Sequence, residues 1–272
     1  PPALRERRER VAAMVEAGRA DARAGRYAAA IERYDEALAL DPGCADAYAG
    51  RGASKATLGS SAEAIADFDA ALALDPNHAD ACLDRSIVNA ALGRYPEAIA
   101  DCTRALALNP AEARAYLNRA VCNAELGLLP EALADFDAAL ELDPRNAQAR
   151  INRGLCCAHM RHFEEAIRDY DEAIALDPGN AWAFHNRGAS KAELGRQAEA
   201  LEDYDWALGL DPRNAATYLN RASCRDALGR HAEALEDFDK ALELGLPSAQ
   251  AGYATRARAR AAAKLEAGPR PR

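Results

Sequence analysis

Aromatic residues and long apolar runs are scarce in this sequence, and basic residues do not predominate. Aromatic side chains make up 6% of the 272 residues, and the formal net charge is −9. Surfaces that bind nucleic acid are normally basic, so this charge argues against a nucleic-acid partner. No apolar run approaches the ~20 residues that a membrane-spanning helix needs. The chain begins Pro-Pro-Ala-Leu-Arg, without a signal peptide and without Met, so we expect a piece of a longer protein.

The cysteines are few and are not spaced as in a small disulfide scaffold. There are seven, an odd number, and they recur at equivalent places in the chain. This usage predicts free thiols that act as small apolar side chains. It also favours a reducing, cytoplasmic compartment.

The chain repeats itself with a period of 34 residues. The period is marked by Asp41-Pro42, Asp75-Pro76, Asn109-Pro110, Asp143-Pro144, Asp177-Pro178 and Asp211-Pro212. Numbering each repeat from 1 to 34 gives seven repeats: 11–44, 45–78, 79–112, 113–146, 147–180, 181–214 and 215–248. A fixed period of this length predicts a stack of small helical units rather than one globular core.

Small and large residues occupy fixed positions in the second half of each repeat. Positions 20 and 27 are Ala in every repeat, and positions 28 and 30 are Leu or Ile. Position 24 is Cys102 in the third repeat and aromatic in the others: Tyr34, Phe68, Phe136, Tyr170, Tyr204 and Phe238. This spacing predicts an amphipathic helix. A first helix is expected over positions 1 to 14, ended by Gly at position 15, which is Arg161 in the fifth repeat.

This pattern resembles the tetratricopeptide repeat. That signature has a large residue at position 4, small ones at 8, 20 and 27, Gly at 15, an aromatic at 24 and Pro at 32. Repeat two fits with Tyr48, Gly52, Gly59, Ala64, Phe68, Ala71 and Pro76. The resemblance implies an all-α, right-handed superhelical solenoid of stacked helix-turn-helix hairpins. It further implies a scaffold that binds a peptide segment or a partner helix in its concave groove, without catalysis or a cofactor.

The pattern stops short of both ends of the chain. Residues 1–10 form a basic N-terminal extension, and residues 268–272 form a tail. Gly245-Leu246-Pro247 replaces the expected Asp-Pro pair, and the Ala-rich residues 249–267 that follow predict a helix. Terminal units of a repeat array need a polar outer face, so this helix is predicted to cap the last repeat.

A charge pair recurs in repeats two to seven. Position 7 is Arg51, Arg85, Arg119, Arg153, Arg187 and Arg221. Position 23 is Asp67, Asp101, Asp135, Asp169, Asp203 and Asp237. Both positions lie eight residues from the turn, and repeat one lacks both. The sequence therefore predicts ion pairs, either within a repeat or to the adjacent one.

The resemblance places positions 2, 5, 6, 9, 12 and 13 of the first helices on the concave face. Position 6 is Asn in four successive repeats: Asn118, Asn152, Asn186 and Asn220. An Asn side chain can donate to a peptide carbonyl and accept from a peptide N–H, so this row could hold an extended backbone. A similar row lines the solenoid of the O-linked sugar transferase family. The alternative is that Asn is simply common at this position of the repeat.

Apolar residues accompany the Asn row at positions 5 and 9. They are Leu83, Ile87, Leu117, Val121, Ile151, Leu155 and Leu219, and repeat six has Trp182 at position 2 and His185 at position 5. Exposed apolar side chains on one face favour a partner-binding surface. The alternative is that they pack between adjacent first helices. Asp46, Asp80 and Asp84 in the N-terminal third would favour a basic group on the partner.

Two more specific sites are not favoured. Receptors for acidic chaperone tails in this family need Lys, Asn and Arg at fixed positions, where the first three repeats supply Val15, Arg19, Gly50, Asp80 and Asp84. Cys156, Cys157, His159 and His162 could suggest zinc. Adjacent residues on a helix diverge by about 100°, however, so Cys156 and Cys157 are expected to be buried thiols and the histidines to be exposed.

No catalytic motif stands out. The sequence has no Gly-rich phosphate loop, no nucleophile elbow and no His-Glu-x-x-His. A non-catalytic interaction scaffold is therefore the favoured function. The alternative is a region that presents substrates to the other domain of a larger enzyme or receptor.

Overall fold

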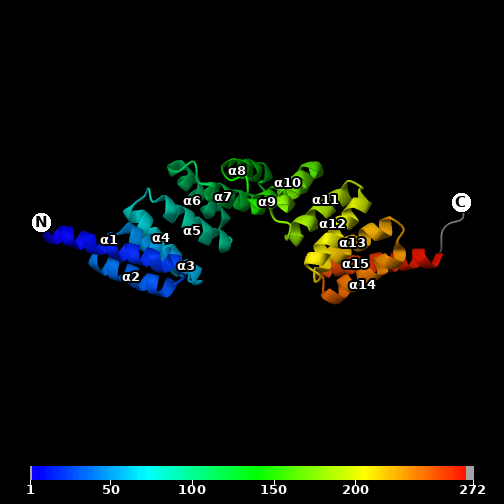
Figure 1. Ribbon diagram of the computed structural model, residues 1–272, viewed down its shortest axis with the longest axis horizontal. Helices are drawn as coiled ribbons and strands as arrows, with labels where there is room; N and C mark the ends of the chain where they lie inside the picture. Colours follow the sequence, from blue (N-terminus) through cyan, green and yellow to red (C-terminus); the bar gives the residue numbers. More distant parts are fainter. Residues whose placement is uncertain (1, 268–272) are drawn as a thin grey trace. The chain divides into compact units, whose positions relative to one another are not determined.

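The computed structural model describes residues 2–267 and is helical throughout that range, so the all-α prediction is confirmed (Figure 1). The helices are α1 Pro2–Arg23, α2 Tyr27–Leu40, α3 Ala45–Thr57, α4 Ser61–Leu74, α5 Ala79–Ala91, α6 Tyr95–Leu108, α7 Ala113–Glu125, α8 Leu129–Leu142, α9 Ala147–His159, α10 Phe163–Leu176, α11 Ala181–Glu193, α12 Gln197–Leu210, α13 Ala215–Ala227, α14 His231–Leu244 and α15 Ser248–Ala267. Within residues 2–267, no helix is both long enough and apolar enough to cross a bilayer.

The helices pair into hairpins that follow the 34-residue register. From the second repeat on, the first helix begins at position 1 and the second covers positions 17 to 30. Helix α1 runs without a break through the residues expected to form a separate extension, so the first helix is longer than the others. Helix α15 packs on α14 and on α13. The tail 268–272 lies outside the described residues.

The chain divides into two compact units. Unit 1, Pro1–Leu142, contains the hairpins from α1 to α8, and unit 2, Asp143–Arg272, contains those from α9 to α14 together with α15. Within each unit the second helix of one hairpin packs on the first helix of the next, as α2 does on α3 and α10 on α11. Each hairpin therefore buries its apolar face against its neighbours, which is how repeat arrays gain stability.

The core of each hairpin is a position-24 side chain set between alanines, aromatic in every repeat except the third, which has Cys102. The position-20 alanines are fully buried, and so are aromatic residues at position 24 such as Phe68, Phe136 and Tyr170. Fully burying one such aromatic side chain contributes about 1.5–3 kcal/mol. The alanines keep the helix axes close enough for the ring to contact both helices.

The side chain at position 24 packs directly against the residue at position 8 of the same repeat. A methyl group added to Gly154 would lie 2.8 Å from a ring carbon of Tyr170, and one added to Gly188 would lie 3.0 Å from Tyr204. All three repeats with Tyr at position 24 have Gly at position 8, whereas Phe68 is accompanied by Gly52, and Phe136 and Phe238 by Ala120 and Ala222. Ala at position 8 therefore occurs beside Phe but not beside the bulkier Tyr.

We expect Gly154→Ala to lower the free energy of unfolding by roughly 1–3 kcal/mol, because the added methyl group overpacks against Tyr170. The matched control is Gly209→Ala in α12, where an added methyl group meets nothing within 4 Å. That control should be neutral or stabilising by up to about 1 kcal/mol, since Ala favours helix. Urea melts of both variants test this; a stabilising Gly154→Ala would contradict it.

The recurring Arg–Asp pairs form within each repeat, which is one of the two pairings left open by the sequence. Most of these Arg residues also reach the Asp at position 25 of the preceding hairpin, which the sequence pattern did not predict, and Arg119 binds Thr103 at that position instead. Together these contacts form a ladder. Arg187 binds Asp203 of its own repeat through Nε (3.0 Å) and Nη2 (2.5 Å), and it reaches Asp171 of the preceding hairpin through Nη1 (2.6 Å). Arg221 repeats the arrangement with Asp237 and Asp205. The ladder thus ties each hairpin together and to its neighbour.

The ladder continues where the sequence pattern ends. Arg258 of α15 binds Asp239 of α14. Asp239 occupies position 25 of repeat seven, as Asp171 and Asp205 do in repeats five and six. Residues at position 11 also join the ladder: Lys55, Asn89, Asn123, Lys191 and Arg225 each contact the buried Asp of their own repeat. Repeat five has Cys157 at this position, and burial raises the pKa of its Asp169.

The two carboxylates of the ladder should differ strongly in their effect on stability. Asp203 is 2% exposed, and Asp203→Ala leaves Arg187 and Lys191 without their inner partner, which should cost about 3–5 kcal/mol. Asp171 binds the same Arg187 but its side chain is 52% exposed, so Asp171→Ala should cost at most about 1 kcal/mol. Comparable losses in thermal or urea melts would show that burial does not determine the strength of these pairs.

Candidate functional site

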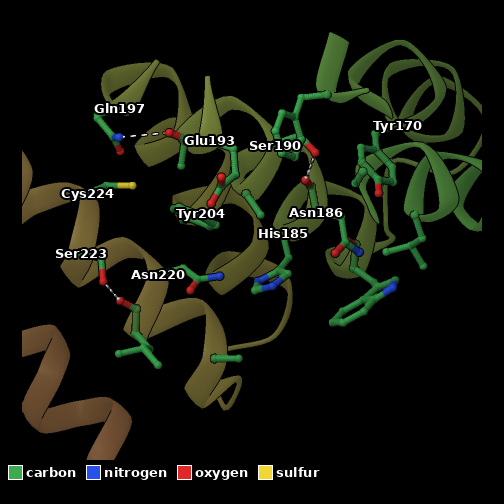
Figure 2. Close-up of a pocket in the computed structure, with 18 of the residues that line it drawn as sticks. Tyr170, His185, Asn186, Ser190, Glu193, Gln197, Tyr204, Asn220, Ser223 and Cys224 are labelled. Carbon is green, nitrogen blue, oxygen red and sulfur yellow. Dashed lines mark hydrogen bonds between the residues drawn. The ribbon is translucent and has the colours of Figure 1, made fainter. Parts of the chain in front are cut away.

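The principal groove of unit 2 follows the first helices of its hairpins and has a volume of about 700 Å³ (Figure 2). Its walls come from α9, α11, α13 and α15, and side chains of α10 and α12 reach its floor from behind. Seven of the predicted concave-face residues belong to its walls or lie beside them: Leu155, Trp182, His185, Asn186, Leu219, Asn220 and, one turn earlier on α9, Asn152.

Trp182 is a fixed aromatic surface in this groove. It lies in the first turn of α11, where the side chain of Asn180 accepts hydrogen bonds from the backbone N–H of Trp182 and Ala183. Its ring stacks on that of His185, with centroids 5.3 Å apart and planes 5° from parallel. Trp182 is 46% exposed, so part of this held ring is left open to solvent.

His185 is buried beneath Trp182 and is neutral at physiological pH. Its Nδ1 lies 2.7 Å from the hydroxyl of Thr217 on α13, and its ring lies 5.9 Å from that of Tyr204. Burial lowers the pKa of His185 to about 4. The residue therefore acts as a neutral support for the tryptophan ring and not as an exposed contact.

The four asparagines of the predicted row do not behave alike. The Asn186 amide donates to the backbone carbonyl of Trp182 (2.8 Å), and Asn152 accepts from the side chain of Gln148 (2.9 Å). The amide of Asn220 points into the groove and makes no hydrogen bond to the described residues (Figure 2). Asn118 belongs to unit 1, where its Nδ2 is buried without a partner among the described residues.

The apolar residues predicted at positions 5 and 9 differ in exposure. At position 5, Leu83, Ile151 and Leu219 are 1–6% exposed, so the expectation of an exposed contact is wrong for these three residues. Their side chains pack into the core because adjacent first helices lie close together, which was the alternative reading. At position 9, Ile87 and Val121 are exposed, and Leu155 and Leu117 are half-buried.

Two tyrosines of the second helices, which were not among the predicted concave-face residues, also line the groove. Tyr170 and Tyr204 contribute to its floor, and the hydroxyl of Tyr170 is buried with no hydrogen-bond partner among the described residues (Figure 2). A buried polar group without a partner costs about 1–3 kcal/mol. In the sequence, these tyrosines can be recognised by Tyr instead of Phe at position 24, together with Gly at position 8.

The groove carries little charge. Among the described residues that line it there is no Lys, Arg or Asp, and Glu193 is the carboxylate. Arg161, at the end of α9, faces Glu193 at 3.9 Å and lies over the ring of Phe163 at 5.3 Å. Arg161 takes the place of the usual glycine and keeps the left-handed φ of 63° that glycine adopts in the other repeats.

The Cys and His residues near the end of α9 differ in burial. Cys156 and Cys157 are buried and His159 and His162 are exposed, as expected from their spacing on the helix. All seven cysteines lie within the described residues and have free thiols.

The first-helix face of unit 1 is more acidic. Asp46 pairs with Arg19 at 2.9 Å, and Asp84 faces Arg114 at 3.8 Å. Burial raises the pKa of Asp84 to about 6.

The buried state of His185 predicts a pH dependence of stability. Its pKa falls from 6.5 to about 4 on folding, so between these values the unfolded chain binds the extra proton and the free energy of unfolding rises with pH. The full shift corresponds to about 3 kcal/mol. His185→Gln can still bond Thr217 but does not titrate, so its unfolding free energy should rise less steeply from pH 4.5 to 7. Equal slopes in urea melts would contradict the neutral buried state.

Comparisons with known proteins agree with this architecture. Sequence models described as Tetratricopeptide repeat match residues 15–79, 83–146, 129–181 and 186–253, and a second such model matches 169–202. A search of curated protein sequences gives no match.

Several solved structures share the fold. YrrB, described as a tetratricopeptide repeat protein with an unusual peptide-binding site, is 25% identical, with a TM-score of 0.62 over 68% of this chain and 95% of its own. The pilF protein of Pseudomonas aeruginosa is 20% identical, with a TM-score of 0.68 over 76% of this chain and 94% of its own. The Cut9–Hcn1 complex of APC/C gives a TM-score of 0.66 at 17% identity, over 87% of this chain and 48% of the matched chain. Since the family's sequence models match most of the residues, the chain belongs to the tetratricopeptide repeat family.

Proposed function

We propose that this chain is a non-catalytic protein-interaction scaffold and that the groove of unit 2 holds an extended peptide segment of its partner. Proteins of this family generally act as protein-interaction scaffolds, and YrrB is described as having a peptide-binding site. The observation that carries the proposal is the groove itself, with its exposed side chains and unused hydrogen-bonding groups.

The groove offers both kinds of contact that an extended segment needs. Asn220 has a free amide that can donate to a peptide carbonyl and accept from a peptide N–H. Leu155 and Trp182 supply apolar surface beside it. Asn186 contributes through the acceptor oxygen that its bond to Trp182 leaves available. Asn152 lies one turn before Leu155 on the same helix, and its amide nitrogen is available.

Asn118, Leu117, Val121 and Ile87 belong to unit 1 and are proposed as a second contact surface of the same kind. The exposed Ile87 and Val121 provide its apolar part.

A displayed library of random linear 12-residue peptides, selected on the full chain, tests the scaffold proposal. Ala189 lies on the groove wall of α11, and Ala189→Trp should fill the groove and weaken the selected peptides at least tenfold. The control is Ala138→Trp, which places Trp at the position that Trp206 occupies in repeat six. Peptides that bind both variants as tightly as the wild type would show that the groove is not the binding site.

Single side chains should have smaller effects. Losing one neutral hydrogen bond costs about 0.5–1.5 kcal/mol, so Asn220→Ala should weaken peptide binding by about tenfold at most. Asn77→Ala, at an exposed loop position, is the matched control. Circular dichroism of each variant should remain that of the wild type.

A further inference from the structure

In the groove of unit 2, the ring of Trp182 is oriented by a neighbouring ring and is also partly exposed to solvent. The stack on His185 orients the ring, and the Asn180 cap and the Asn186 bond hold the backbone N–H and carbonyl of the same residue. His185 is in turn held by Thr217. A side chain that is already ordered loses little conformational entropy when a ligand packs on it.

The charge around this ring does not favour a strongly charged ligand. No Lys or Arg lines the described part of the groove, so an acidic side chain would meet no permanently charged cation there. Trp182 lies in the first turn of α11, where backbone N–H groups give the helix end a partial positive charge that disfavours cations. The one carboxylate, Glu193, is at the opposite end of α11 and faces Arg161.

A second feature of the groove also lacks a partner. The hydroxyl of Tyr170 is buried on the groove floor and pairs with nothing among the described residues. Figure 2 shows Tyr170 on the same side of the groove as Asn186. Asn186 itself lies about one helical turn after Trp182 on α11. A neutral donor or acceptor on a bound segment would satisfy this hydroxyl.

We propose that Trp182 and Tyr170 form an anchor subsite for an uncharged segment bearing an aromatic side chain, whose ring stacks on Trp182 and whose neighbouring polar group bonds the Tyr170 hydroxyl. Tyr253 of α15, which is 43% exposed, adds a second aromatic surface to the same groove. Aromatic pairs gain about 0.5–1.5 kcal/mol beyond the area that they bury. This inference rests on the proposed peptide-binding function and specifies the chemistry of its ligand.

The peptides selected on the full chain provide the first test. Those that lose binding to Ala189→Trp should be enriched in Phe, Tyr or Trp and should lack charge around that residue. Groove-dependent peptides enriched instead in Arg, Lys, Asp, Glu or Pro would overturn the aromatic subsite and leave the scaffold proposal intact. A library without groove-dependent peptides would overturn both.

A double-mutant cycle tests the stacking contact. The best groove-dependent peptide and its aromatic-to-Leu analogue are titrated against the wild type and Trp182→Leu by fluorescence polarisation. We expect Trp182→Leu to weaken the aromatic peptide about 3- to 10-fold more than the Leu analogue. The control is Trp206→Leu, because Trp206 is the other tryptophan and is 64% exposed on α12, outside the groove. Equal losses for both peptides would contradict stacking on Trp182.

Tyr170→Phe distinguishes a ligand-binding hydroxyl from a structural one. Phe occupies position 24 in other repeats, and the lost hydroxyl has no partner in the described protein, so the melting temperature should stay the same or rise. Peptide affinity should nevertheless fall about 3- to 10-fold, as for one lost hydrogen bond. The control is Tyr34→Phe in unit 1, which makes the same change outside the groove and should leave affinity unaltered. Unchanged affinity in Tyr170→Phe would remove this hydroxyl from the subsite.

Discussion

The contact between the position-24 ring and the small residue at position 8 determines how the rest of the structure is arranged. Because Gly154 has no side chain, Tyr170 can pack against α9, and its hydroxyl lies buried beneath the groove floor. Phe in the same place, as at Phe136, fills the core but has no polar group to present. The hydroxyl oxygen that distinguishes Tyr from Phe at position 24 thus decides whether the second helix of a repeat places a polar group beneath the groove.

The Arg–Asp ladder supplies the specificity that apolar packing alone lacks. Alanine-rich faces could slide past one another with little loss of contact, whereas Arg187 must meet Asp203 and Asp171 at once. Asp203 is almost fully buried, so an out-of-register hairpin would leave a charge without a partner in a poorly solvated place. The continuation of the ladder to Arg258 explains how α15 closes the array without a repeat signature.

The sequence was sufficient for the helices, their turns and the Arg–Asp pairs within each repeat, but not for the second Asp at position 25 that joins neighbouring hairpins. It was insufficient where the outcome depends on distances between neighbouring helices. Leu83 and Ile151 look like surface residues on a single helix, but both are buried, and Leu83 belongs to one core cluster with Ala115 of the next first helix. Likewise, Asn186 and Asn220 occupy the same position of the repeat, yet only Asn186 turns back to the carbonyl of a neighbouring tryptophan.

Several departures from the repeat rules gather in repeat five, which contributes part of the groove. Arg161 keeps a left-handed φ without being glycine, Arg150 replaces the aromatic residue at position 4 and leaves its Nε buried without a partner among the described residues, and Tyr170 has a buried unpaired hydroxyl. Each departure costs stability that an ordinary repeat residue would retain. Natural proteins tolerate such costs mainly at functional sites, where local rules are broken for binding. The ligand proposed for the groove would account for the stability lost in repeat five.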